Sequence, residues 1–430
     1  FQQLFPWTGA WSEGFFCFGG LVLVMSLHVF PFLMTMLKNA MLNIPASLEE
    51  SGAVFGADFR MRLRRIFAPL LTGNYAIGAL LVFVKTLSEY GTPYTLGRRI
   101  GFYVFTTDIH RYSTTAPIDF GRSASLSSVL ICICMGMWLL QNYITSRTSY
   151  RLVSGKGSRP ARTELSRIGQ ILAWLWVLLV VLIAIGVPYF SIISTSLIKL
   201  RGYGLAAGNF TFAHYTELFS TEKALDSIGC SLFLAVSSAT ICSVIGTAVV
   251  VTVQRARGIG SKALEGISLL PEMLPSIVLV IGIMLFWNAI YRVMPLYNTI
   301  GIMVLAYVVL YLPYTVQYVS SAFTQINGSL LEAGRTFGGS PSYVFRRITL
   351  PMISRGIFAG WMMIFIIAFR ELVTASLIAP PNVLVVSTYI NREFEQGSVS
   401  LGMAMAVLCV LITTTALLVF NYVTGKVRKA

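Results

Sequence analysis

Nine long apolar runs dominate this chain, and each is long enough to cross a membrane as a helix. One helical span needs about 20 predominantly apolar residues. Hydrophobic residues fill 56% of the 430 positions and charged residues fill 11%, whereas soluble domains average roughly 25% charged residues. The sequence therefore predicts an all-α, polytopic membrane protein. The expected spans cover residues at about 15–37, 72–93, 123–146, 172–197, 230–254, 267–290, 300–323, 356–378 and 399–424.

A polar stretch of 20 residues occurs twice, at an offset of 282 positions. The first copy begins at Glu50 and reads ESGAVFGADFRMRLRRIFAP, and the second begins at Glu332 and reads EAGRTFGGSPSYVFRRITLP. Each copy lies between two apolar runs, so the chain is expected to contain a duplicated membrane unit that presents the same loop twice. The matched loop positions are Glu50, Gly52, Phe55, Gly56, Arg64 and Arg65 in the first copy, and Glu332, Gly334, Phe337, Gly338, Arg346 and Arg347 in the second.

The residues of each loop predict two short helices that can enter a groove of a soluble partner. Glu332 is expected to open the first helix, and Gly334 and Gly338 to leave one of its faces flat for close backbone approach. Phe337 provides an apolar knob beside that face. Pro341 is expected to begin the second helix, because proline suits the first position of a helix.

The spacing of these residues resembles the cytoplasmic EAA loop of permease subunits in binding-protein-dependent ABC importers. In the second copy Glu332, Ala333, Gly338 and Pro351 fit the pattern, and Gly334 replaces the second alanine. The first copy departs further. Two such loops in one chain are similar to the fused permeases of ferric-iron importers. The resemblance implies a type I importer permease with two parallel six-helix repeats.

The same resemblance implies a transport subunit that works with other proteins and is not itself an enzyme. Its partners would be two cytoplasmic ATPase subunits and an extracytoplasmic solute-binding protein, with ATP and magnesium held by the ATPase subunits. A phosphate-binding loop requires the pattern G-x-x-x-x-G-K-[ST], and neither Gly155–Lys156 nor Gly425–Lys426 fits it. We therefore expect no catalytic residue, metal site or cofactor in this chain.

Basic residues indicate how the chain is oriented. Alternation of nine spans places on one side of the membrane the four loops 43–69, 147–167, 255–265 and 324–355, together with the tail 425–430. These segments hold 20 of the 32 Lys and Arg residues. Because such residues favour the cytoplasmic side, the loops and the C-terminus are expected there. The resemblance implies that the membrane is a bacterial cytoplasmic (inner) membrane. Anionic lipid therefore explains the net charge of +15, and a nucleic-acid partner is not expected.

The repeat also predicts how the chain is divided. Residues 1–146 are expected to form the C-terminal part of the first repeat, with about three spans and the loop 43–69. Residues 147–170 form a polar cytoplasmic linker. Residues 171–430 form the complete second repeat, with about six spans and the loop 324–355. By the offset of the repeat, about 118 further residues are expected to precede Phe1.

Ionisable residues within the expected spans are candidates for a solute pathway, because a charge in a membrane is costly and usually serves a purpose. Glu89 and Glu371 occupy equivalent repeat positions. They could line a cation pathway, or they could form structural ion pairs with Lys85 and Arg370. We favour the ion pairs. The candidate pathway residues are Glu89, Glu371, Arg370, Lys85, Tyr90 and Thr374.

Other functions and other substrates stay open at this level. A gradient-driven secondary transporter or channel would carry broken midplane helices, relay charges or a filter. Few residues here fit, although Pro271 and Pro275 are expected to distort one span. A membrane scaffold would leave both loops unexplained. Ferric iron is the favoured solute, and related permeases carry polyamines, phosphonates, sulfate or thiamine.

Overall fold

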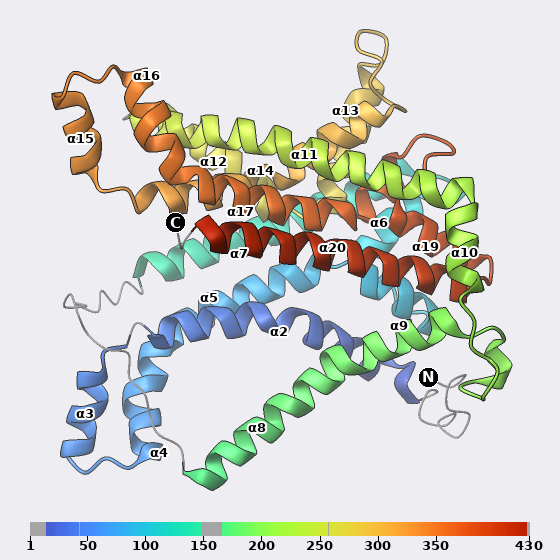
Figure 1. Cartoon of the computed structure of the whole chain (residues 1–430), viewed down its shortest axis with the longest axis horizontal. Helices are drawn as coiled ribbons and strands as arrows, with labels where there is room; N and C mark the ends of the chain where they lie inside the picture. The colour runs from blue at the N-terminus through green and yellow to red at the C-terminus, as the bar shows by residue number, and fades with distance from the viewer. Residues whose placement is uncertain (1–13, 43, 148–165, 257, 428–430) are drawn as a thin grey trace. The chain divides into compact units, whose positions relative to one another are not determined.

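The computed structural model describes residues 14–42, 44–147, 166–256 and 258–427, and it is built from helices (Figure 1). An isolated β-bridge joins Ile198 and Phe210. The predicted all-α membrane fold is therefore confirmed. Eight described helices are long and apolar enough to cross a membrane, and a ninth span is possible if one bent pair counts as a single span.

The chain divides into two compact units, one formed by residues 7–112 and 119–191 and the other mainly by residues 192–430. In the first unit the helices are α2 (Phe18–Leu42), α3 (Ala46–Val54), α4 (Phe59–Arg62), η2 (Leu63–Phe67), α5 (Ala68–Leu87), η3 (Pro93–Gly97), η4 (Arg98–Ile100), α6 (Phe105–Thr114), α7 (Phe120–Arg147), α8 (Arg167–Val181) and η5 (Leu182–Gly186). Helix α9 (Val187–Leu197) crosses the boundary between the units, and so does the end of α6 at Ser113 and Thr114.

The second unit contains the remaining helices. They are η6 (Arg201–Tyr203), α10 (Ala213–Ser220), α11 (Glu222–Arg255), α12 (Ile259–Met273), α13 (Ser276–Ala289), α14 (Ile300–Thr324), α15 (Gly328–Thr336), α16 (Pro341–Val344), η7 (Phe345–Thr349), α17 (Leu350–Phe369), α18 (Val373–Ile378), α19 (Val386–Glu395) and α20 (Val399–Val427).

Three of the expected spans differ from the prediction: two end earlier, and one is bent. The span expected at 72–93 ends at Leu87, and the span expected at 356–378 ends at Phe369, with α18 as a separate short helix. The span expected at 267–290 is a pair of helices, α12 and α13, bent by 109°. That bend falls at Leu274 and Pro275, because a proline removes a backbone donor and clashes with the preceding turn.

The core of the second unit is the mutual packing of α11, α14 and α17. Lipid tails are as apolar as leucine, so membrane helices associate through close packing at small residues. Gly356 shows this closeness, because a Cβ atom there would lie 2.6 Å from the Ala322 Cβ and 2.8 Å from the Tyr318 carbonyl oxygen. Large side chains such as Tyr307 and Phe369 are fully buried in the same cluster.

Helix bounds recur at the offset of the sequence repeat. Adding 282 to the bounds of α2, α3, α4, η2 and α5 gives the bounds of α14, α15, α16, η7 and α17. The close approach of helices recurs as well: Gly78 lies against Leu33, and Gly360 lies against Thr315 at the equivalent positions. The repeated stretch therefore folds in the same way in both copies. The number of helices in each repeat and the domain boundaries stay predictions.

Candidate functional site

Each repeated loop is a helical hairpin that leads directly into a membrane-spanning helix. In the second copy α15 turns into α16, and α16, η7 and α17 continue without interruption from Pro341 to Phe369. The turn requires a left-handed backbone, with φ of +81° at Gly338 and +77° at the equivalent Gly56, a region that glycine enters without steric cost. The side chains of Ser340 and Asp58 then cap the second helix of each hairpin.

The first helix of the hairpin begins earlier than the sequence indicated. Glu332 is not its opening residue, because α15 starts at Gly328 and the Asn327 side chain accepts a hydrogen bond from the Ser329 backbone N–H at 3.3 Å. The expectation that Pro341 begins the second helix is confirmed. An asparagine that precedes a helix is a strong cap signal, and the sequence analysis did not use it.

In each hairpin, a glycine of the first helix packs closely against an isoleucine that follows the second helix. A Cβ atom at Gly334 would lie 2.7 Å from the Ile348 Cδ1, and a Cβ atom at Gly52 would lie 2.8 Å from the Ile66 Cδ1. The flat face expected for a partner is therefore used at these two positions to pack the hairpin internally. Gly56 and Gly338 have open space around them and shape the turn.

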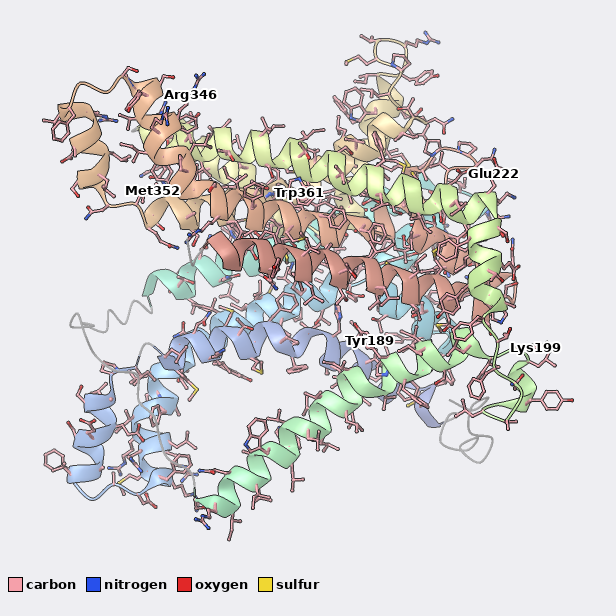
Figure 2. The ribbon with its side chains drawn as sticks, viewed as in Figure 1. Tyr189, Lys199, Glu222, Arg346, Met352 and Trp361 are labelled. Atoms are coloured by element: carbon pink, nitrogen blue, oxygen red, sulfur yellow. The ribbon has the colours of Figure 1, made fainter. Side chains whose placement is uncertain are left out.

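Phe55 and Phe337 extend from the tips of the hairpins into open surroundings. Their exposed fractions are 90% and 91%, although burial of such a ring is strongly favourable in water. Exposed charged residues surround them, and Figure 2 places Arg346 at the hairpin end of the second unit and Glu222 at the opposite end. The exposed charged residues of the two hairpins are Glu50, Asp58, Arg60, Arg64, Arg65, Glu332, Arg335, Arg346 and Arg347.

The first hairpin contains an ion pair that the sequence analysis missed. Arg62 Nη1 donates a hydrogen bond to Glu49 Oε1 at 3.1 Å, and the two side chains are only 19% and 9% exposed. In the second copy Leu331 and Val344 occupy the equivalent positions. A pair of opposite charges that replaces two apolar residues in one copy is the signal that could have revealed this contact.

Crowding at Gly334 gives a testable prediction. Gly334→Leu is expected to destabilise the hairpin by about 1–3 kcal/mol, because the added carbons overlap Ile348 and Val344 in a packed contact. Ile348→Ala should recover much of that loss by making room. The measurement is thermal unfolding of the purified protein together with protease cleavage of the hairpin. Gly266→Leu is the control, since nothing lies within 4 Å of a Cβ atom there; equal effects at both glycines would contradict the packing argument.

Glu371 lies just after the end of α17 and binds three different segments. Its Oε1 accepts hydrogen bonds from the Thr374 backbone N–H at 3.0 Å and from the Thr374 hydroxyl at 3.1 Å. Its Oε2 accepts one from the Tyr311 hydroxyl on α14 at 2.5 Å. The Glu371 carbonyl accepts one from the Ser387 hydroxyl on α19 at 2.5 Å.

Glu89 has matching partners in the first unit. Its Oε1 accepts from the Thr92 backbone N–H at 3.3 Å, and its carbonyl accepts from the Thr106 hydroxyl at 2.7 Å. Its Oε2 lies 3.8 Å from the His28 Nε2 on α2. The position equivalent to Tyr311 in the first copy is Val29. Its neighbour His28 therefore contacts Glu89 in place of a tyrosine.

The ion pairs expected between Lys85 and Glu89 and between Arg370 and Glu371 are not among the ion pairs of the described residues. Helix α5 ends at Leu87, so Lys85 and Glu89 do not share the helical face that an i, i+4 pair needs. The Lys85 Nζ instead lies 6.0 Å from the Phe32 ring centroid. Arg370 is exposed while its neighbour Glu371 is turned inward.

Tyr90, another candidate pathway residue, is buried in a cluster of aromatic rings. Its ring centroid lies 5.1 Å from that of Tyr94 and 4.9 Å from that of His110. Burial lowers the pKa of the His110 imidazole to about 4, because a charged ring would lose its hydration. The cluster packs the segment that follows Glu89. Thr374 is likewise buried and caps the turn at Glu371.

The bend between α12 and α13 carries an acid as well. Glu272 directly follows Pro271, and the Gln317 side chain of α14 donates a hydrogen bond to Glu272 Oε2. Helix α12 packs along α14, so this contact fixes the bend to the core of the second unit. Among the described residues no group of three or more His, Cys, Asp or Glu side chains could hold a metal ion.

These features define a class: a multi-pass α-helical membrane protein with two like hairpins, each continuous with a span. Residues 243–429 match the model of the family of binding-protein-dependent transport system inner membrane components. The resemblance of the chain to permeases of ABC importers, and to ferric-iron permeases among them, is thereby confirmed.

Two curated relatives match along nearly the whole chain, and a third matches less than half of it. A ferric transport system permease protein of Actinobacillus pleuropneumoniae is 23% identical over 429 residues, which are 97% of this chain and 60% of that protein. An Fe(3+)-transport system permease protein of Haemophilus influenzae is 24% identical and covers 92% of this chain, which spans 74% of it. A putrescine transport system permease protein of Escherichia coli is 28% identical over 186 residues, 43% of this chain and 66% of that protein.

A solved structure matches the fold. It is a bacterial alginate ABC transporter in complex with an alginate pentasaccharide-bound periplasmic protein, and the match has a TM-score of 0.51 at 17% identity. The match covers 61% of this chain and 95% of the chain in that structure. At this level of identity the likeness shows the fold alone.

Proposed function

We propose that this chain is the membrane-spanning subunit of an ATP-driven importer, and that its solute is ferric iron delivered by an extracytoplasmic binding protein. One observation carries the proposal: a hairpin with an almost fully exposed phenylalanine at its tip occurs twice and is continuous each time with a spanning helix. An exposed aromatic ring flanked by charges is typical of the anchor of a protein–protein contact.

The partners of the two hairpins would be two cytoplasmic ATPase subunits, which hold ATP and magnesium. Closing of these subunits on ATP would move both hairpins, and the helices α5 and α17 would carry that movement into the membrane. The pathway would then open outward to receive the solute, and hydrolysis would return it to the inward state. In this proposal the protein lies in a bacterial inner membrane with its C-terminus in the cytoplasm, and it performs no covalent chemistry.

Ferric iron is favoured as the solute because two relatives that match more than nine-tenths of the chain are named as ferric permeases. The putrescine permease among the relatives supports polyamines as the alternative. A cation pathway past Glu89, Glu371, Arg370, Lys85, Tyr90 and Thr374 stays an untested alternative role for these residues.

Reconstitution in proteoliposomes tests the proposal. The full-length protein with its ATPase subunits and binding protein is expected to take up ferric iron only when ATP is present. Uptake that needs an ion gradient in place of ATP would identify a secondary transporter and overturn the proposal. Uptake of putrescine that ferric iron does not inhibit would keep the importer and replace its solute.

The turn glycine gives a prediction for this contact. Gly338→Val is expected to weaken binding of the ATPase subunit about tenfold, because a β-branched residue pays roughly 1–2 kcal/mol in a left-handed turn. Gly338→Asn should bind nearly as well as the parent protein, since asparagine tolerates this conformation. Gly56→Val should have a smaller effect, because the first loop follows the family pattern less closely. Co-purification of the ATPase subunit with each variant measures the difference, and equal binding of all three would contradict a role for the turn.

A further inference from the structure

The two acids that follow α5 and α17 have the same three kinds of contact in both units. We infer that Glu89 and Glu371 are positioning residues, each of which fastens the helix break at the far end of a helix that continues from a hairpin. This inference rests on the proposed function, in which the hairpins receive movement from ATPase subunits. In this role the two carboxylates bind donors within the protein and do not bind the solute.

The contacts of Glu371 join three parts of the second unit. The side chain caps the start of α18 through the Thr374 backbone N–H and hydroxyl, and it reaches α14 through the Tyr311 hydroxyl. The main chain of Glu371 holds α19 through the Ser387 hydroxyl. Backbone N–H groups at the start of a helix lack partners within the helix and favour a nearby carboxylate. One residue therefore ties the helix that leaves the hairpin to the core and to the next two helices.

Glu89 repeats this arrangement with longer contacts. The distance from its Oε1 to the Thr92 backbone N is 3.3 Å, compared with 3.0 Å at Thr374. Its Oε2 faces His28 at 3.8 Å, where Glu371 accepts a 2.5 Å hydrogen bond from Tyr311. A chance arrangement would not supply a threonine three residues later, a partner from the preceding span and a hydroxyl on the main-chain carbonyl at both acids. The contacts of Glu371 are therefore shorter than those of Glu89.

The position of these acids relates them to the hairpins. Helix α17 contains 20 residues and ends two positions before Glu371, so it reaches about 30 Å from the base of its hairpin. A packed helix of this length moves as a rigid body. Movement of the hairpin therefore reaches the break, and the contacts of Glu371 determine whether α18 and α19 move with α17 or separate from it.

Both carboxylate oxygens of Glu371 are already engaged by protein donors, which argues against its use as a solute ligand. The amide of glutamine can reproduce these contacts, since its oxygen can accept from Thr374 and its NH₂ group can donate to the Tyr311 hydroxyl. A cation ligand, in contrast, needs the negative charge. The two roles therefore predict opposite results for the same substitution.

The experiment compares Glu371→Gln with Glu371→Ala in the reconstituted complex. We expect Glu371→Gln to retain ATP-driven uptake of ferric iron within about threefold, and Glu371→Ala to lose about tenfold or more, because its donors lose their acceptor. Tyr311→Phe should also lower uptake. Glu222→Gln, an exposed acid at the start of α11, is the control for loss of charge. Loss of uptake in Glu371→Gln equal to that in Glu371→Ala would overturn the inference in favour of a cation pathway.

A second measurement separates this inference from the proposed function. Hydrogen exchange of the amides of residues 372–378 should be faster in Glu371→Ala and unchanged in Glu371→Gln, and the change at residues 90–97 in Glu89→Ala should be smaller. If the parent complex shows no ATP-driven uptake, the proposed function fails while the exchange result still decides the fastening role. Equal exchange rates in Glu371→Ala and the parent protein would overturn the inference whatever the complex transports.

Discussion

The double substitution Phe55→Asp with Phe337→Asp is expected to abolish binding of the ATPase subunits and ATP-driven uptake, while the membrane-spanning part still folds. Each ring is about nine-tenths exposed at the tip of its hairpin, so its removal costs the isolated protein little packing. A central aromatic anchor typically contributes about 2–4 kcal/mol to a protein interface, so loss of both should weaken binding by several orders of magnitude. Co-purification of the ATPase subunits and uptake in proteoliposomes measure the effect.

The single substitutions and a matched exposed ring complete this experiment. Phe337→Asp and Phe55→Asp alone should each leave part of the binding, because the other hairpin still has its anchor. Phe212 is 73% exposed but lies outside both hairpins, so Phe212→Asp should leave ATPase binding unchanged. A double variant that still binds the ATPase subunits, in a complex that hydrolyses ATP at the parent rate, would show that the hairpins are not the docking sites.

Sequence reasoning succeeded where one physical demand determined the pattern. A bilayer requires long uncharged helices, and the apolar runs therefore predicted the spans as far as Leu87 and Phe369. The repeat also predicted that the same glycine recurs in both loops, although Gly338 was expected on a helix face and instead forms the left-handed turn after Thr336. The family resemblance rested on the same residues and was confirmed by the match of residues 243–429.

The partners of buried side chains were not predictable in the same way. The expected pairing of Lys85 with Glu89 assumed a continuous helix, whereas the helix ends between them and the acid faces His28 instead. Tyr311 lies 60 positions before Glu371 in the sequence, so only the packing of α14 beside α17 brings the two together. Long-range contacts of this kind depend on tertiary structure that periodicity does not describe.

The ion pair of the first hairpin leads to a prediction with a comparably large effect on stability. Arg62→Val should destabilise that hairpin by about 2–3 kcal/mol, because it removes the guanidinium that pairs with the Glu49 carboxylate, a side chain only 9% exposed. This loss is smaller than the roughly 3–5 kcal/mol expected when a fully buried ion pair is broken, because Arg62 retains some contact with water. Glu49→Leu should have a similar but smaller effect, since it removes the acceptor of Arg62.

The double substitution Glu49→Leu with Arg62→Val copies the second hairpin and is expected to restore most of the stability. Val344 is buried at the position equivalent to Arg62, and the Arg62 side-chain carbons lie beside Gly52 much as Val344 lies beside Gly334. The shape of the contact is therefore already compatible with apolar residues, and replacement of a buried ion pair by well-packed apolar residues is often neutral or stabilising.

A double-mutant cycle on the thermal unfolding of the purified protein measures this coupling. We expect a coupling energy of about 2 kcal/mol or more, with the double variant more stable than either single one. Strictly additive effects would mean that Glu49 and Arg62 do not stabilise the hairpin through each other. Because Phe55 at the tip is untouched, the double variant should also bind the ATPase subunits normally, which separates the stability of the hairpin from its docking surface.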